Sequence, residues 1–162
     1  MTSIASGSLS SNTVTISTIS GSYNDLKLIV RDFYCASDDY LNIRLNGDTG
    51  NSYGWAALSQ SAEDTAVTWA DGVRDRYFVN YNNQDNTDNN NSAIITIHDY
   101  ANTSTFKLVT IQSVVRDAGN AFYSNALFSA NFRSTSAIDS ITMFSQNTTN
   151  FSGGTYVLYG VK

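Results

Sequence analysis

Few side chains in this sequence could do acid–base chemistry. The single histidine, His98, is followed directly by Asp99. Because successive side chains of a strand point to opposite faces, a strand over this segment would separate the imidazole from the carboxylate. A general base needs a hydrogen-bonded partner, so this pair does not indicate catalysis. The single cysteine, Cys35, has no activating base near it in the chain, which is typical of a buried or incidental thiol.

The carboxylates offer two further possibilities, paired acids and metal ligands. Glu63 is the only glutamate, so a glycosidase-type pair would have to come from aspartates, and the adjacent aspartates at 38–39 fit a solvated turn. Asp48, Asp85 and Asp88 lie in polar stretches rich in asparagine, and their oxygens would suit calcium. Turn formation explains the same residues. The sequence therefore predicts a protein that is not an enzyme and has no cofactor, while calcium at Asp48 or Asp85 stays open.

Aromatic residues are the other candidates for function. The chain has ten tyrosines and two tryptophans. Tyrosine has an apolar body and a polar tip, and it is favoured at interfaces. We expect residues 53–69 to lie in a long connection, where loops often carry function. The candidate interface residues are Tyr53, Trp55 and Trp69, together with Phe151 in an otherwise polar turn. The alternative is that these rings belong to the core.

Composition indicates one globular domain. Of 162 residues, 41% are apolar and only 14% are charged, so solubility rests on uncharged polar side chains. We assign residues 1–12 to a polar N-terminal arm, or an extended lead into the first strand, and residues 13–162 to a single β-sandwich domain. Proline is absent, which removes one usual protection of sheet edges.

Charge and hydropathy exclude other classes of partner. The net charge is −5, and no basic cluster extends beyond Arg74-Asp75-Arg76, so we expect no nucleic-acid partner. No apolar run reaches the roughly 18 residues of a membrane span, so we expect no membrane partner. The N-terminus has no secretory signal, so we expect synthesis and folding in a cytoplasm.

Alternating β-branched and aromatic residues predict the strands that must position these side chains. Residues 137–162 are expected to form a closing hairpin whose last strand inserts between earlier strands, because an apolar chain end frays unless a sheet holds it. In the strand over residues 25–33, Leu26 and Leu28 share one face and Phe33 lies on the other. Further strands are expected over residues 13–19, 40–45, 73–81, 93–100, 105–115 and 121–133.

Turn signals about every ten residues predict an all-β fold, an antiparallel two-sheet sandwich of eight to ten strands. We prefer a jelly-roll-like topology because the strand number is near eight and the connection from 46 to 73 is long. That connection could hold a short helix over residues 55–58 and 61–64. Residues 82–92 are expected to form a solvated, mobile loop.

Several stretches carry a resemblance to a known family. They are Tyr23-x-Asp25-Leu26-x-Leu28, Leu41-x-Ile43-Arg44-Leu45-Asn46-Gly47-Asp48, His98-Asp99-Tyr100-Ala101-Asn102-Thr103, Ile138-x-x-Ile141, Asn150-Phe151-x-x-Gly154-Thr155 and Leu158-Tyr159-Gly160-Val161-Lys162. This pattern resembles small virion structural proteins of tailed bacteriophages, which end in a strand reading like LYGI or LYGV. The resemblance covers residues 55–92 least.

The resemblance implies a jelly-roll-like sandwich that multimerises on the virion and has no catalytic residues. Because the chain shows no long shaft, the resemblance favours a capsid decoration or cement protein on the capsid surface. The partners that it implies are the major capsid protein lattice and further copies of the chain, with a homotrimer favoured. The alternative is a tail fibre or baseplate domain that binds a host surface glycan through aromatics such as Trp55 and Trp69.

Overall fold

The computed structural model describes residues 1–61, 67–87, 89–119 and 123–162. Every regular element in these residues is a β-strand, which confirms the all-β prediction. The described residues contain no helix of the length and apolarity needed to cross a membrane. The strands are β1 (Thr2–Ser8), β2 (Thr13–Ile16), β3 (Asp25–Cys35), β4 (Leu41–Leu45), β5 (Tyr53–Ser61), β6 (Thr68–Arg74), β7 (Tyr77–Phe78), β8 (Ser92–His98), β9 (Lys107–Arg116), β10 (Tyr123–Phe132), β11 (Ile141–Ser145) and β12 (Phe151–Val161).

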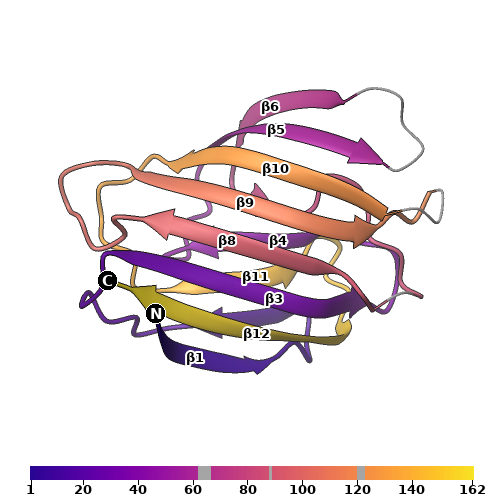
Figure 1. Cartoon of the computed structure of the whole chain (residues 1–162), viewed down its shortest axis with the longest axis horizontal. Helices are drawn as coiled ribbons and strands as arrows, with labels where there is room; N and C mark the ends of the chain where they lie inside the picture. Colours follow the sequence, from indigo (N-terminus) through magenta and orange to yellow (C-terminus); the bar gives the residue numbers. More distant parts are fainter. Residues whose placement is uncertain (62–66, 88, 120–122) are drawn as a thin grey trace.

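The strands form two antiparallel sheets that lie one behind the other as a sandwich (Figure 1). The larger sheet has eight strands in the order β1-β12-β3-β8-β9-β10-β5-β6, and the smaller has four in the order β2-β11-β4-β7. The last strand, β12, lies between β1 and β3, as the sequence predicted. The strand number exceeds the expected eight to ten for two reasons. The sequence did not predict β1 or β5, and it predicted one strand over residues 73–81 where the structure has the end of β6 and β7.

Eight of these strands pair as a jelly roll. Counted among these eight, the first strand pairs with the eighth, the second with the seventh, the third with the sixth and the fourth with the fifth. The pairs are β1–β12, β2–β11, β3–β8 and β4–β7. The other four strands form two inserted hairpins, β5–β6 after β4 and β9–β10 after β8. These hairpins pair with each other through β10 and β5, and β9 joins them to β8. We call β9, β10, β5 and β6 the extension.

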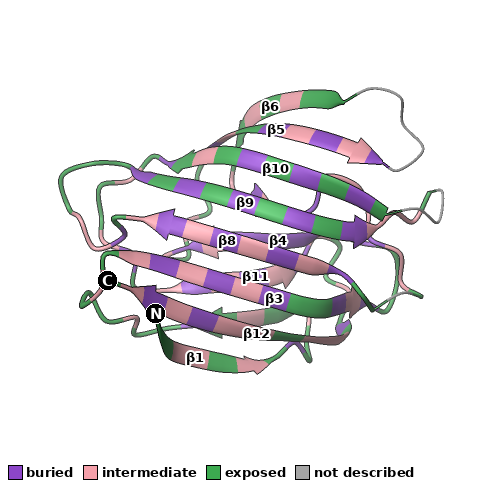
Figure 2. Cartoon of the chain, viewed as in Figure 1, coloured by how far each residue is buried: buried purple, intermediate pink, exposed green. Residues whose placement is uncertain are grey.

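One row of inward side chains runs from the jelly roll into the extension. Leu158, Leu28, Ile95, Ile111 and Phe128 lie in register on successive strands, and all are buried. Buried and exposed residues alternate along β9 and most of β10 (Figure 2). A slip of one residue would turn the whole apolar set outward, so burial of one face fixes the register.

A β-bulge in β3 corrects the predicted orientation of Phe33. Asp32 has a φ of 56°, and two residues of β3 lie opposite the single residue Gly154 of β12. The extra residue resets the alternation, so Phe33 is fully buried instead of facing away from the core. Gly154 has a φ of 124°, and a Cβ there would lie 2.9 Å from the Phe33 backbone, so this position requires glycine.

The N-terminal segment forms an edge strand, where an arm or extended lead was expected. β1 pairs with β12 along its length and forms one edge of the larger sheet. The next residue, Leu9, is 2% exposed, and its N–H donates to the Gly154 carbonyl at 2.9 Å. Small polar residues can occupy an edge strand because main-chain hydrogen bonds supply the pairing.

The predicted helix in the long connection is wrong. Residues 55–58 lie within β5, and Ser61 is the last residue of that strand. Residues 62–64 of the predicted helix lie outside the described residues. Strand pairing to β10 and β6 on both sides outweighs the weak helix propensity of this short stretch.

The prediction of a solvated loop over residues 82–92 is also wrong at both ends of the stretch. Gln84 is fully buried, and its backbone bridges Asp39 and Asp117. Asn91 is fully buried as well, and its side-chain amide donates to the Phe33 carbonyl at 2.7 Å. Amide side chains satisfy buried backbone groups that water cannot reach, so a polar stretch can be part of the interior.

Candidate interaction surfaces

The reactive side chains are placed where they stabilise the fold. His98 Nδ1 lies 3.5 Å from a carboxylate oxygen of Asp25 on the neighbouring strand, and both side chains are partly exposed. Sequence reasoning considered only Asp99, because a partner on another strand is invisible in the local pattern. Burial, reinforced by the charge of Asp39, raises the pKa of the fully buried Cys35 thiol to about 12. A thiol that stays protonated is a poor nucleophile.

Two of the candidate calcium ligands make turns. Asp48 Oδ1 accepts a hydrogen bond from the Gly50 N–H at 2.6 Å. Asp85 Oδ1 accepts from the N–H and the hydroxyl of Thr87, each at 2.6 Å. An aspartate that bonds the backbone two residues ahead forms an Asx turn. The turn interpretation therefore accounts for both loops.

The predicted solvated turn at residues 38–39 is corrected at its second position. Asp39 is fully buried, and its carboxylate accepts hydrogen bonds from the backbone N–H groups of Tyr40 and Asn147. Among the residues that the structure describes, no three His, Cys, Asp or Glu side chains converge as metal ligands. Glu63 and Asp88 lie outside those residues.

The four predicted interface residues divide into core and surface. Tyr53 is fully buried and Phe151 is 4% exposed, so both rings stabilise the core and offer no contact to a partner. Trp69 is 78% exposed on edge strand β6. Trp55 is half-buried on β5. Trp69 pairs with Leu58, which stands three residues from Trp55, so strand alternation places the two tryptophans on opposite faces of the sheet.

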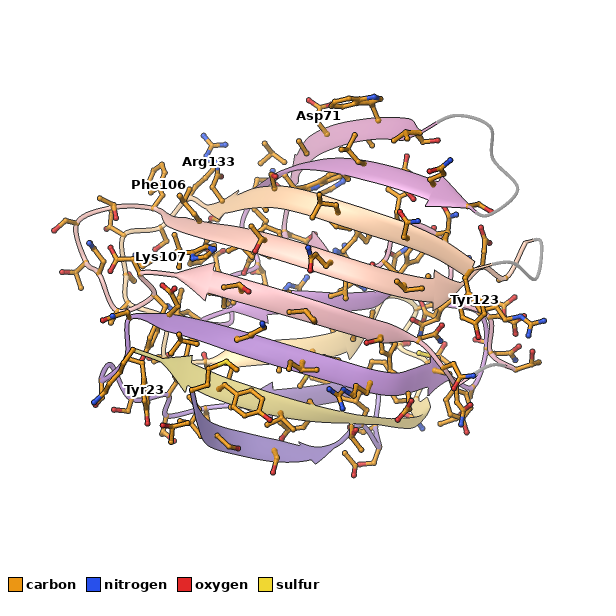
Figure 3. The ribbon with its side chains drawn as sticks, viewed as in Figure 1. Tyr23, Asp71, Phe106, Lys107, Tyr123 and Arg133 are labelled. Carbon is orange, nitrogen blue, oxygen red and sulfur yellow. The ribbon has the colours of Figure 1, made fainter. Side chains whose placement is uncertain are left out.

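The outer surface of the extension carries most of the exposed apolar side chains. We call this surface the extension face. Figure 3 shows Phe106 and Tyr123 near its two ends and Asp71 on β6. Its apolar members, which are Trp69, Val73, Leu108, Val114, Tyr123 and Leu127, are each at least 39% exposed. Most of its other outward positions are uncharged, namely Thr110, Gln112, Asn125, Ser129, Asn131, Ala56 and Gln60. The charged side chains on this side of the sheet are Asp71, which pairs with Ala56, and Arg116, which pairs with Tyr123.

The extension face has the size of a protein interface. Four strands about 4.8 Å apart, with up to ten residues at about 3.4 Å each, cover roughly 600 Å². A standard interface buries about 800 Å² per partner. A shallow depression of about 380 Å³ lies at the edge of this surface, between Ile94 of β8 and Gln112 and Leu127 of the extension. The sequence does contain a signal for this face. Residues 105–115 have apolar residues in both phases of the alternation, which indicates a strand with apolar side chains on both sides.

A second surface feature is a pocket where the extension meets the smaller sheet. We call it the end pocket. Phe78 of β7 packs edge-on against Tyr40, with ring centroids 5.7 Å apart, and against Trp55, with centroids 6.2 Å apart. Tyr81, Arg74 and Gln146 complete the lining of a cavity of about 270 Å³. Burial and the charge of Asp117 raise the pKa of the Tyr40 phenol above its usual value of 10, so this hydroxyl remains a hydrogen-bond donor.

A cationic hollow adjoins the end pocket. It has a volume of about 320 Å³, and Gln146 lines both cavities. The Arg44 guanidinium carbon lies 4.5 Å from the centroid of the Phe144 ring, and that of Arg76 lies 5.9 Å from it. Both arginines form ion pairs with Asp75. Within the described part of the chain, Arg74 makes no ion pair.

Comparison with known proteins gives no family and no curated relative, since no family model and no curated protein matches the chain. One solved structure comes from work on endo-acting O-glycanases that members of the human gut microbiota express to initiate mucin breakdown. It is 8% identical with a TM-score of 0.20, and the match covers 93% of this chain and 79% of that chain.

Two further structures are of the flagellar cap protein FliD from Escherichia coli. The D1-D2-D3 form is 11% identical with a TM-score of 0.15, covering 96% of this chain and 56% of that one. The D2-D3 form is 9% identical with a TM-score of 0.14, covering 96% and 98%. Scores this low carry no argument about fold or function, so the proposals below rest on the chain itself.

Proposed function

We propose that this protein is a structural component of a tailed-phage virion, a decoration or cement protein that binds the outer capsid surface. The virion context comes from the sequence resemblance, and the docking surface is the extension face. The proposed partners are the major capsid protein lattice and further copies of the chain, with a trimer favoured. The protein would be made in the host cytoplasm and would function on the particle without catalysis.

The observation that carries this proposal is the placement of exposed apolar side chains. Apart from Met1, every large apolar side chain that is exposed among the described residues lies on the extension or directly beside it, as Val67 and Phe106 do. Exposed apolar side chains gathered on one surface often mark protein interaction sites. The pairing of the two inserted hairpins gives the face a rigid support, which suits docking onto a regular lattice.

Binding would stabilise the capsid by mass action. A ligand that binds only the assembled lattice lowers its free energy by RT ln(1 + [L]/Kd) at each site. A trimer that contacts several capsid subunits would bind each further site at a high effective concentration. Many weak contacts of uncharged side chains can therefore reinforce a particle.

The test is thermal rupture of particles that lack this protein, with and without the purified chain added back. We expect rupture at a higher temperature when the chain is bound. Leu127→Lys should abolish binding, because it puts a charge in the middle of the extension face. Ile29→Lys is the matched control, since Ile29, Ile94, Gln112 and Leu127 lie in one register row of the sheet, with Ile29 in the jelly roll.

Thermal unfolding of each free variant separates loss of binding from loss of folding. Equal rupture temperatures with and without the chain would remove the cement role. Equal loss of binding in both folded variants would remove the extension face as the docking surface. Immunogold labelling of intact virions then locates the protein, and label on the tail instead of the head would reject the capsid assignment.

A further inference from the structure

The end pocket has fixed aromatic walls. Phe78 holds Tyr40 and Trp55 in edge-to-face contacts, and Trp55 also packs edge-on against Phe128, with centroids 5.9 Å apart. Aromatic pairs in this geometry add about 0.5–1.5 kcal/mol each beyond the area that they bury. The walls are therefore preformed, which reduces the ordering that a ligand would require.

The polar groups of the end pocket are available to a ligand. Among the described residues, the guanidinium of Arg74 and the side-chain amide of Gln146 make no hydrogen bond or ion pair, although the Gln146 backbone N–H donates to the Tyr40 carbonyl at 3.2 Å. The phenols of Tyr40 and Tyr81 add two groups that can both donate and accept. Aromatic surface with a few placed polar groups is the usual composition of a small-molecule site.

Three arginines lie around the pocket in an acidic protein, while the charges of Asp117 and Asp39 act on Tyr40. The whole chain has a net charge of −5. Arg44, Arg74 and Arg76 gather at the end pocket and its cationic hollow, and Asp75 is the carboxylate that pairs with two of them. Among the described residues, Arg74 is the one of these three arginines that has no ion pair. A guanidinium without a partner is the side chain best suited to hold a carboxylate through two parallel hydrogen bonds.

We propose that the end pocket binds an acidic sugar, with its ring against Trp55 and Tyr40 and its carboxylate on Arg74. A pyranose ring has an apolar face of C–H groups and a rim of hydroxyls, which matches aromatic walls with Gln146 and phenol groups between them. The cavity of about 270 Å³ is at the small end of ligand pockets and suits one sugar unit. The adjoining hollow with Arg44 and Arg76 provides room for the next unit.

A saccharide fits these residues better than a proline-rich peptide does. Aromatic grooves that bind polyproline segments take several residues of an extended helix. The end pocket instead has two phenols, one amide and one guanidinium in a cavity that fits a single ring. The site does not depend on the extension face, so a particle could use one surface to dock and leave the other open to cell-surface glycans.

The probes are 3′-sialyllactose and trigalacturonic acid, with lactose as the neutral control, measured by the fluorescence of Trp55. The chain has two tryptophans, so Trp69→Phe leaves Trp55 as the only indole fluorophore. We expect at least one acidic probe to change this fluorescence saturably and lactose to bind roughly tenfold more weakly, because a charge-assisted pair is lost. In Trp55→Phe, the remaining Trp69 should give no response.

Two arginine variants decide the role of the charge. Arg74→Ala should weaken binding of the acidic probe by roughly tenfold or more. Arg31→Ala should leave it unchanged, because the exposed Arg31 lies on β3 in the jelly-roll half and does not line the pocket. Equal affinity for lactose and the acidic probes, or unchanged binding in folded Arg74→Ala, would overturn the proposal. So would failure of both acidic probes to bind, or binding of a proline-rich peptide at Trp55 in their place.

Discussion

The two halves of the larger sheet share one core but have different outer surfaces. The inward row that contains Leu28 and Phe128 runs through both halves. On the outside, the jelly-roll half presents charged side chains such as Lys27 and Arg31, whereas the extension presents mostly uncharged and apolar ones, with Asp71 as an exception. Charged side chains on the outside of a sheet favour contact with water, whereas exposed apolar side chains favour contact with another protein. Apart from Met1, the large exposed apolar side chains therefore gather on and beside the inserted half of the sheet.

The largest effect that we predict concerns the strand that completes the jelly-roll half. Ending the chain after Tyr156 removes residues 157–162, which pair with both β1 and β3 and include the fully buried Leu158. We expect complete loss of cooperative folding, because the lost packing exceeds the typical stability of about 5–15 kcal/mol. Circular dichroism melting measures this, and removal of Lys162 alone is the control. A truncated chain that still melted cooperatively would contradict the central position of β12.

The next prediction tests whether the two halves fold as one unit. Leu28→Ala in the jelly roll and Phe128→Ala in the extension should each lower the free energy of unfolding by about 3–4 kcal/mol, because each leaves a cavity in the same core. Urea denaturation followed by two spectroscopic probes measures both. If Phe128→Ala gave a separate early transition, the extension would be a unit of its own.

A smaller effect is expected at the junction of the halves. The buried Tyr53 hydroxyl on β5 accepts from the Leu45 N–H at 3.0 Å and lies 2.9 Å from the Asp48 carbonyl, and burial raises the pKa of Tyr53. Tyr53→Phe should cost about 1–3 kcal/mol of unfolding free energy, because a buried N–H loses its partner. The control is Tyr159→Phe, on the half-buried outer side of β12. Equal, small changes in both variants would refute a specific role for the Tyr53 hydroxyl.

The smallest effect is a pH-dependent link between β4 and the end of β6. Burial alone would raise the pKa of Asp75, but hydrogen bonds from Arg44 and Arg76 outweigh it and lower the pKa below its usual value. The stabilisation is therefore present above about pH 4 and is lost as the pH falls through the folded-state pKa.

Asp75→Asn should thus reduce stability by about 0.5–1 kcal/mol at pH 7, since the pair is partly exposed. The difference from the parent protein should shrink toward zero at pH 3. Urea denaturation at both pH values measures it, with Asp71→Asn on β6 as the control. A difference that stayed constant with pH would show that the Asp75 charge does not stabilise the fold.

The local sequence pattern correctly predicted several strands, among them β9, β10 and the C-terminal strand β12. Residues 105–115 and 121–133 contain enough β-branched and aromatic residues to indicate β9 and β10, and the apolar C-terminus indicated an inserted strand. Phe33 was misplaced because a single extra residue at Asp32 changes the phase, and nothing local marks that residue. Residues 55–58 were misread because strand pairing on both sides overrides weak propensity.

Site residues were harder to predict than strands. Tyr53 and Phe151 differ from Trp69 only in what packs over them, and the sequence does not record that. Likewise, the partner of His98 proved to be Asp25, 73 residues earlier in the chain. The end pocket draws its lining from separate segments around residues 40, 55, 74–81 and 146, which no spacing rule connects.

By itself, the sequence determined that this protein is an all-β sandwich whose last strand is internal, because side-chain alternation and apolar content are local properties. Only the tertiary structure decided that two hairpins enlarge the jelly roll, that Trp55 and Trp69 face opposite sides, and that three arginines meet beside an aromatic pocket. These features depend on pairing between segments far apart in the chain. Such pairing follows from the packing of the whole core, in which each strand is placed by its neighbours.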